Sequence, residues 1–321
     1  MSGVTASLTG LLADPELAAF VRASREAAAP SGRQLGPTAL RAEQRRRAEA
    51  RPPGPTLTAV DDMAVPGGVA VRFYRPSPGI HPLVVFLHGG FWTIGDLESH
   101  DRACRRIAAG AGTAVLAVDF RRAPESPWPA AVEDVVRVLG WAASRPAELA
   151  GLDGRLVVAG DSSGGNLAAL ACLQLRDDGG AMPAAQVLAY PNTDLTMSQP
   201  SVAEKATGWG ITADEIAWGA GLWVPDAALR ADPRVSPLHA TNLAGLPPAV
   251  IVTAEHDPLR DEGEAYAARL ADAGAQVRLR REKRMIHGFL TLDTVSPAAA
   301  RAGQRLIADI AATLTTHPAS R

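Results

Sequence analysis

Cysteine is scarce in this chain of 321 residues and occurs only as Cys104 and Cys172. Both cysteines lie in helix-like stretches, which argues against a disulfide framework and excludes a cysteine-rich metal site. We expect both side chains to be small buried hydrophobic groups. No other pattern in the sequence implies a metal or a cofactor.

An excess of charge of one sign is also missing, because 32 Lys and Arg residues stand against 34 Asp and Glu residues, for a formal net charge of −2. This balance provides no field that would steer nucleic acid or an anionic membrane to the protein. A small uncharged ligand is compatible with it. The basic stretch 41–51 is diluted by Glu43 and Glu49, so we interpret it as a solvated helix face.

Long hydrophobic runs are absent as well. No stretch approaches the roughly 18 apolar residues of a transmembrane helix, so we expect no stable membrane insertion. The first residues, MSGVTASLTGLLADPEL, have no basic leader and reach an Asp before an apolar run of signal-peptide length. The sequence therefore predicts a cytoplasmic protein.

The composition, 47% hydrophobic and 21% charged, is that of an ordinary globular protein, and one α/β domain with insertions fits the length. From residue 57 onward, segments typical of strands alternate with segments typical of helices. Short, continuous apolar strands between helices predict a parallel sheet that is covered on both faces. The predicted strands are 69–74, 83–87, 114–120, 156–159, 186–190, 249–254 and 276–281. Helix-length segments include 128–144, 164–176 and 259–273.

Two regions do not follow this alternation. Residues 1–55 are helix-like and end in the breaker run RPPGP, so we expect N-terminal helices outside the sheet. Residues 195–235 are rich in Gly, Pro and Trp, and the sequence TADE at 212–215 predicts a capping box at the start of a helix. The remaining segments, 56–194 and 236–321, would form the core.

Half of the six tryptophans lie in the 195–235 insertion, at Trp209, Trp218 and Trp223. This cluster favours a lid over a ligand pocket. The alternative is that the three side chains only fix the insertion to the core.

The segment Gly160-Asp161-Ser162-Ser163-Gly164 has the pattern G-x-S-x-G. The pattern alone is weak, but here a predicted strand leads into it and a helix-like run follows it, as a nucleophile elbow requires. A serine on so sharp a turn needs neighbours without Cβ atoms, and the N-terminus of the following helix stabilises developing negative charge. We therefore predict Ser162 as a nucleophile and the backbone N–H of Ser163 as an oxyanion donor.

A serine hydroxyl needs an imidazole to take its proton and an acid to orient that imidazole. His287 is flanked by Gly288 in a loop after the last predicted strand, where a side chain can reach over the carboxyl edge of the sheet. We predict that His287 is the base. We expect four other histidines to lie at the surface, namely His81, His100, His239 and His317.

The acid should follow another strand. Asp257 comes directly after the predicted strand 249–254, and Pro258 would fix it at the start of the next helix. The order Ser162, Asp257, His287 along the chain is that of α/β-hydrolases. Glu255 and Asp261 remain lesser candidates for the acid.

The segment His88-Gly89-Gly90 directly follows the predicted strand 83–87. A hydrolase of this class places oxyanion donors at that point. We therefore predict an oxyanion hole formed by the N–H groups of Gly89, Gly90 and Ser163.

Together, these residues resemble the bacterial hormone-sensitive-lipase-like esterases (family IV). The resemblance spans roughly residues 70 to 290 and is carried by the blocks HGGFWTIGDLESHD, RAPESPWPAAVEDV, GDSSGGNLA, YP, DPLRDEGEAYAARL and MIHGF. It implies an α/β-hydrolase fold, with an eight-stranded, mostly parallel sheet and a helical cap formed by the N-terminal helices and the 195–235 insertion. It also implies the triad Ser162, Asp257 and His287, and a homodimer formed through an edge strand is compatible with it.

The chain departs from this family at three positions. Phe91 stands where a third Gly is common, Ser163 stands where a small apolar residue is common, and Arg284 replaces a Gly before Met285. Phe91 still has an N–H but cannot adopt dihedral angles that only glycine allows, so the sequence leaves open which amides of this loop point at the oxyanion. Phe91 and Trp92 would narrow the acyl side of the pocket and favour short chains. The expected pocket wall consists of Phe91, Trp92, Asp161, Trp209, Trp218 and Trp223.

The sequence thus predicts a serine carboxylesterase that cleaves small-molecule esters of short to medium acyl chain through an acyl-enzyme. An amidase or a deacetylase of a small metabolite, or a dehydratase as in some plant relatives, would use the same site. The third hypothesis is a non-catalytic ligand-binding protein, because plant gibberellin receptors resemble the family but lack the catalytic histidine. The presence of His287 argues against that hypothesis.

Overall fold

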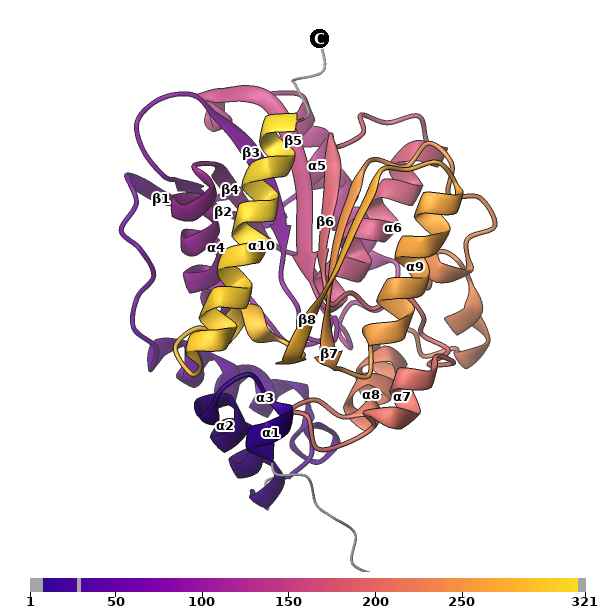
Figure 1. Ribbon diagram of the computed structural model, residues 1–321. Coiled ribbons are helices and arrows are strands. Elements are labelled where there is room, and N and C mark those ends of the chain that lie inside the picture. Colours follow the sequence, from indigo (N-terminus) through magenta and orange to yellow (C-terminus); the bar gives the residue numbers. More distant parts are fainter. Residues whose placement is uncertain (1–7, 28–29, 317–321) are drawn as a thin grey trace, which may run out of the picture.

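The structure, a computed structural model, describes residues 8–27 and 30–316 of the chain. Its centre is one sheet of eight strands in the order β1-β2-β4-β3-β5-β6-β7-β8 (Figure 1). The first two strands pair antiparallel, as do β2 and β4, and all other neighbours are parallel. The strands are β1 (Ala59–Ala64), β2 (Ala70–Arg75), β3 (His81–Leu87), β4 (Ala114–Asp119), β5 (Leu152–Asp161), β6 (Ala185–Ala189), β7 (Ala249–His256) and β8 (Val277–Ile286).

Each of the seven predicted strands overlaps an observed one, and the mostly parallel eight-stranded sheet implied by the family resemblance is confirmed. The strand that the pattern missed is β1. It lies at the edge of the sheet, where its only strand partner is β2, and its sequence AVDDMA has no buried side chain. An edge strand need not bury either face, so the hydrophobic pattern that reveals inner strands is missing here.

Helices cover both faces of the sheet (Figure 1). Side chains alternate along each inner strand, so Val85 joins the hydrophobic cluster on one face while Val84 and Phe86 join the cluster on the other. The first face is covered by α5 (Ala130–Ala143), α6 (Ser163–Asp177) and α9 (Arg260–Asp272), and the second by α4 (Leu97–Ala111) and α10 (Pro297–Thr316). This double cover explains why the inner strands are continuous apolar runs.

A second group of helices lies at the end of the sheet where β7 and β8 terminate (Figure 1). Its N-terminal members are α1 (Leu8–Leu11), α2 (Pro15–Glu26) and α3 (Gly32–Glu49), and its other members are α7 (Pro200–Glu204) and α8 (Ala213–Trp223) from the insertion. The predicted capping box of α8 is present, because Thr212 and Glu215 exchange hydrogen bonds. Residues 1–7, 28–29 and His317 lie outside the described residues.

The insertion is anchored at its start by Asp194, whose side chain is buried. Its carboxylate accepts hydrogen bonds from the backbone and hydroxyl of Thr196, from Ser198 Oγ at 2.7 Å and from His239 Nε2 at 2.9 Å. Burial opposes ionisation, but the hydrogen bonds from Ser198, Thr196 and His239 outweigh it and lower the pKa of Asp194 to about 2.

A carboxyl group whose pKa is lower in the folded chain stabilises the fold above its unfolded pKa, and this stabilisation is lost as pH falls through the folded pKa. We therefore expect the free energy of unfolding of Asp194→Asn to decrease less than that of the wild type as the pH is lowered. The difference in free energy of unfolding between wild type and variant should be constant above about pH 5 and should shrink by about 2 kcal/mol between pH 4 and pH 2. Urea unfolding at several pH values measures this difference. The control is Asp214→Asn, which replaces an exposed carboxylate of α8 and should leave the pH dependence of unfolding unchanged. If the difference in free energy of unfolding between wild type and Asp194→Asn does not vary with pH, the prediction is contradicted.

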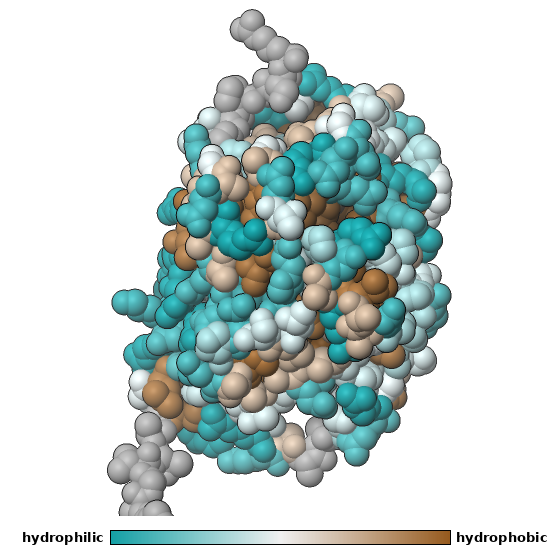
Figure 2. Space-filling model, turned by 90° about the vertical axis from the view of Figure 1, so that its right-hand side faces the viewer, coloured by the Kyte–Doolittle hydropathy of each residue, from teal (hydrophilic) through white to brown (hydrophobic). Residues whose placement is uncertain are grey.

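Among the described residues, no helix combines the length and the apolar character that crossing a bilayer requires. On the side of the molecule that Figure 2 shows, hydrophilic residues form most of the surface and hydrophobic ones occur in separate small areas.

Candidate active site

Ser162 lies at the sharp turn between β5 and α6, with φ 56° and ψ −122°. A side chain on either flanking glycine would collide with backbone: a Cβ on Gly160 would overlap Gly164, and a Cβ on Gly164 would overlap Leu87. The glycines therefore let the serine occupy a turn that other residues would block. The strand, turn and helix expected of a nucleophile elbow are all present.

Three side chains from three different loops meet at this turn. His287 Nδ1 lies 2.8 Å from Asp257 Oδ2, and His287 Nε2 lies 3.0 Å from Ser162 Oγ. Asp257 is fully buried and follows β7, whereas His287 follows β8 and is 10% exposed. Because the parallel strands end at the same edge, residues far apart in sequence come together there. This is the geometry that a Ser-His-Asp triad requires.

The lesser candidates for the acid have other partners. Glu255 accepts the backbone N–H of Arg284 at 2.6 Å, and Asp261 accepts the backbone N–H of Ser201 at 2.9 Å. Neither carboxylate forms a hydrogen bond to His287 within the described part of the chain. Arg284, one of the three departures from the family, has a left-handed φ of 59°.

Gly89 differs from the prediction made for it. Its N–H is donated to Asp161 Oδ1 at 2.9 Å, so it is engaged within the protein. This finding corrects the assignment of Gly89 as an oxyanion donor. The sequence could not reveal it, because Asp161 stands 72 positions further along the chain.

Asp161 is buried directly before the serine and also faces His100, whose Nε2 lies 3.2 Å from Asp161 Oδ1. Burial alone would raise the pKa of Asp161. His100 opposes this effect through its charge and its hydrogen bond, and the Gly89 N–H adds a further hydrogen bond. Together these interactions outweigh burial and hold the pKa of Asp161 below its ordinary value. The expectation of a surface position for His100 was therefore wrong: its ring is buried and lines the cavity beside Ser162.

The loop from His88 to Asp96 presents two further N–H groups. The Gly89 carbonyl accepts from His88 Nδ1 at 2.9 Å, and the Gly90 carbonyl accepts from the N–H groups of Thr93 and Ile94 at 3.0 and 2.8 Å. In a trans peptide the N–H points opposite to the C=O, so these bonds fix the directions of the Gly90 and Phe91 N–H groups. Neither N–H forms a hydrogen bond within residues 8–27 and 30–316.

Phe91 adopts φ 56°, although a glycine is common at this position in the family. The left-handed region costs a non-glycine residue about 1–2 kcal/mol but does not exclude it. The ring packs against Ile211 and Ile216, and a Cβ on Gly219 of α8 would lie 2.5 Å from the Phe91 Cβ. The insertion thus supports the backbone conformation of this loop.

A cavity of about 270 Å³ lies over Ser162 and His287. Its other walls come from the loop after β3, from α2 and α3, from the insertion and from the segment after β8, and they include Phe20, Gln44, Phe91, Ile94, Asp161, Ile211 and Leu292. A second cavity, of about 390 Å³, extends beneath α3. The two cavities share the residues Gln44, Ile94, His100, Gly210, Glu215 and Thr291.

The tryptophans do not line the cavity over Ser162, and their assignment to the pocket wall is corrected. Trp92 and Trp223 are buried and stack face to face with centroids 4.4 Å apart. Trp209 stacks on His256 at 4.1 Å, and Trp218 is also buried. These rings fix the insertion to the rest of the protein, which is the alternative that the sequence left open. Phe91 and Asp161 are the two predicted wall residues that do line the cavity.

Residues that the sequence did not reveal surround Ser162, His287 and Asp257. Tyr190 packs against His287 with centroids 4.7 Å apart and donates its hydroxyl to Asp161 Oδ2 at 3.4 Å. Gln44 reaches the cavity from α3. Tyr190 stands in the short block YP that carries part of the family resemblance, which was the one available signal. Nothing in the sequence around Gln44 distinguishes it from a surface residue of a charged helix.

Comparison with known proteins gives a consistent result. A family described as alpha/beta hydrolase fold matches residues 84–291. The carboxylic ester hydrolase LipN of Mycobacterium tuberculosis is 43% identical over 288 residues, which cover 86% of this chain and 76% of LipN. The ethyl acetate hydrolase of Pseudomonas putida is 35% identical over 302 residues, 88% of this chain and 93% of that protein. The crystal structure of a thermostable esterase from Pseudomonas putida ECU1011 superposes with a TM-score of 0.88 at 32% identity and full coverage of both chains.

Proposed function

Because this chain belongs to the hormone-sensitive-lipase-like esterases of the α/β-hydrolase fold and is a carboxylic ester hydrolase, we propose that Ser162, His287 and Asp257 form its catalytic triad. We also propose that its substrates are esters of short to medium acyl chain. The observation that carries the proposal is the chain of hydrogen bonds from Asp257 through His287 to Ser162 at the floor of a cavity.

In this mechanism Ser162 Oγ attacks the ester carbonyl while His287 Nε2 takes the hydroxyl proton. Asp257 holds the Nδ1 proton of the imidazole and so keeps Nε2 free to accept. The tetrahedral intermediate collapses as His287 returns the proton to the departing alcohol. A water molecule then attacks the acyl-enzyme as His287 takes its proton. His287 passes this proton to Ser162 Oγ as the carboxylic acid is released.

The oxyanion hole of this proposal consists of the N–H groups of Gly90, Phe91 and Ser163. The first two have fixed directions and no partner within the described chain, and Ser163 begins α6 directly after the nucleophile. Donors that are preset before the reaction need no reorganisation when charge develops on the substrate oxygen. Phe91 replaces Gly89 in this assignment, because the Gly89 N–H is bound to Asp161.

Two observations favour short chains. The cavity over Ser162, about 270 Å³, is slightly smaller than the usual ligand site, which measures about 300–1,000 Å³. The similar protein of Pseudomonas putida acts, by its name, on ethyl acetate. The adjoining cavity beneath α3 offers room for a longer group, so the proposal extends to medium chains. Helices α1–α3 and the insertion 195–235 form the cap in this proposal, and α2, α3 and the insertion contribute walls to both cavities. The cytoplasmic location and the homodimer stay predictions.

Initial rates on p-nitrophenyl esters from acetate to palmitate test the proposal. We expect the highest kcat/KM at acetate to hexanoate and a steep fall beyond them. Pretreatment with a fluorophosphonate should abolish the activity, because such probes react with an activated serine. A folded protein without activity on the whole series would contradict the proposed substrates, and activity that survives the fluorophosphonate would contradict the serine mechanism.

Phe91 sets the chain-length limit in this proposal, because its ring forms a wall of the cavity. Phe91→Ala keeps the cost of the left-handed backbone but removes the ring, so we expect the optimum to move to longer acyl chains by two or more carbons. The same ester series measures the shift. Leu279→Ala, at an exposed side chain of β8, should keep the wild-type profile. An unchanged optimum in a folded Phe91→Ala variant would place the acyl chain elsewhere.

A further inference from the structure

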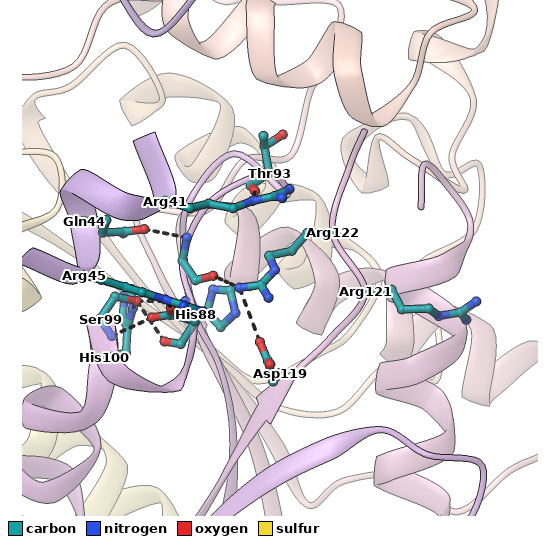
Figure 3. Close-up of polar contacts among 12 residues, drawn as sticks. Arg41, Gln44, Arg45, His88, Thr93, Ser99, His100, Asp119, Arg121 and Arg122 are labelled. Atoms are coloured by element: carbon teal, nitrogen blue, oxygen red, sulfur yellow. Dashed lines mark hydrogen bonds and ion pairs between the residues drawn. The ribbon is translucent and has the colours of Figure 1, made fainter. Parts of the chain in front are cut away.

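The loop between β3 and α4, residues 88–96, carries the Gly90 and Phe91 N–H groups, and α3 lies beside it. Figure 3 shows the side chains of Arg41, Gln44 and Arg45 extending from α3 toward this loop. Positions 41, 44 and 45 are three and four residues apart, so they lie on one face of the helix. We call this set of three side chains the α3 clamp.

Each clamp residue holds a different point of the loop. Arg41 Nε donates to the Thr93 carbonyl at 2.8 Å, Gln44 Oε1 accepts the Gly95 N–H at 2.6 Å, and Arg45 Nε donates to Asp96 Oδ2 at 2.7 Å. The contacts are thus made to three of four consecutive residues. Together they fix the end of the loop that returns to α4.

Arg41 has a second set of contacts that hold it in place. It donates to the Ala123 carbonyl at 2.8 Å and pairs with both carboxylate oxygens of Glu125 at 2.7 Å. Its side chain is 22% exposed, against 59% for Arg45. A guanidinium held by both oxygens of one carboxylate has a defined orientation. Arg41 is therefore fixed more firmly than Arg45, and Gln44 is the clamp residue that also lines the cavity over Ser162.

Gly95 is held from both sides. Its N–H is bound by Gln44, and its carbonyl accepts from Arg122 Nη1 (Figure 3). With φ 90° it packs so closely that a Cβ at this position would overlap the Gly89 carbonyl and the ring of His88. A displacement of Gly95 is therefore transmitted by direct contact to the peptide that bears the Gly90 N–H.

We propose that Arg41 and Gln44 are positioning residues of the oxyanion hole, so that the cap helix α3 sets the rate of the chemical step as well as covering the substrate. The inference rests on the proposed function of the Gly90 and Phe91 N–H groups. Misplacement of a catalytic group by about 1 Å can cost about 10²-fold in rate. Because the clamp does not bond to the reacting atoms, its loss lowers kcat and leaves KM for a small ester unchanged.

The test compares two substitutions of one side chain. Gln44→Met keeps the length of the side chain but removes the acceptor for the Gly95 N–H, whereas Gln44→Glu keeps an acceptor oxygen. With p-nitrophenyl acetate we expect Gln44→Met to lower kcat about tenfold at unchanged KM, and Gln44→Glu to recover most of that loss. Arg46→Ala is the matched control, because Arg46 lies on the same helix and its side chain pairs, among the described residues, only with Glu43. Its kcat should equal that of the wild type.

Hydrogen–deuterium exchange separates this inference from the proposed function. Gln44→Met should speed exchange in residues 88–96, with an unchanged melting temperature and unchanged exchange in α6, whether or not the protein hydrolyses esters. Wild-type kcat in Gln44→Met, or equal losses in the Met and Glu variants, would overturn the positioning role. Unchanged exchange of the loop in Gln44→Met would overturn the clamp itself. Inactivity of the wild type would instead refute the proposed function.

Discussion

Ser162→Ala is expected to lower kcat for p-nitrophenyl esters by about 10⁶ and to leave the fold intact. Ser162 Oγ has His287 Nε2 as its hydrogen-bond partner, so the substitution removes one contact and no packing. Alanine occupies the left-handed φ of 56° at a cost similar to that of serine. Steady-state rates, together with the melting temperature and the circular dichroism spectrum, measure both parts of the prediction.

Ser163→Ala is the matched control for this prediction. The Ser163 hydroxyl is buried and has no hydrogen-bond partner among the described residues, whereas its proposed role belongs to the backbone N–H, which alanine retains. We therefore expect Ser163→Ala to keep kcat within a few-fold of wild type. A large loss of kcat in Ser163→Ala, with turnover preserved in Ser162→Ala, would indicate that Ser163 is the nucleophile instead of Ser162. Full activity in both variants would refute a serine nucleophile at this turn.

Asp257→Asn is expected to lower kcat by about 10⁴, the size of effect seen when a triad imidazole is held in the wrong tautomer. The orientation of the new amide can be derived from the structure. Asp257 Oδ1 accepts the Leu259 N–H at 2.9 Å, so the oxygen of an asparagine is needed there and its NH₂ group must face His287 Nδ1. Nδ1 then has to accept, the ring proton moves to Nε2, and the imidazole can no longer take the proton of Ser162.

Measurement of kcat at several pH values, with the melting temperature as a check on folding, tests this effect. Asp261→Asn is the control, because its carboxylate binds the backbone of Ser201 and the side chain of Arg260 and lies outside the triad. It should retain kcat within a few-fold. A loss in Asp261→Asn similar to that in Asp257→Asn would indicate that both substitutions act through stability, and an active Asp257→Asn variant would refute the proposed acid.

The parts of the fold that could be predicted are those in which local sequence carries the constraint. Inner strands are buried on both faces, and the elbow at Ser162 needs glycines on both sides. Parallel strands also bring their following loops to one edge, which is why Ser162, Asp257 and His287 could be placed together from the chain order alone. The edge strand β1 carries no such constraint and was missed.

The parts that could not be predicted depend on contacts between distant segments. The Gly89 N–H was assigned to the oxyanion hole because its position in the loop allowed it, but Asp161 from the next strand in the sheet takes it. The tryptophans were assigned to a pocket wall from composition, whereas Trp92 and Trp223 stack on each other and Trp209 stacks on His256. The sequence around His100 indicates only the start of a helix, and its pairing with Asp161 depends on how α4 packs against the sheet.

The left-handed backbone of non-glycine residues around the cavity has a consequence for attempts to make this enzyme withstand heat. Ser162, Phe91 and Arg284 each occupy a conformation that glycine would adopt more easily. A screen for thermal resistance alone would therefore favour glycine at Ser162, the proposed nucleophile, and the selected variants would include stable proteins that no longer turn over substrate. A glycine at position 284 would leave the proposed triad in place and would keep the backbone bonds to Glu255 and Ala13.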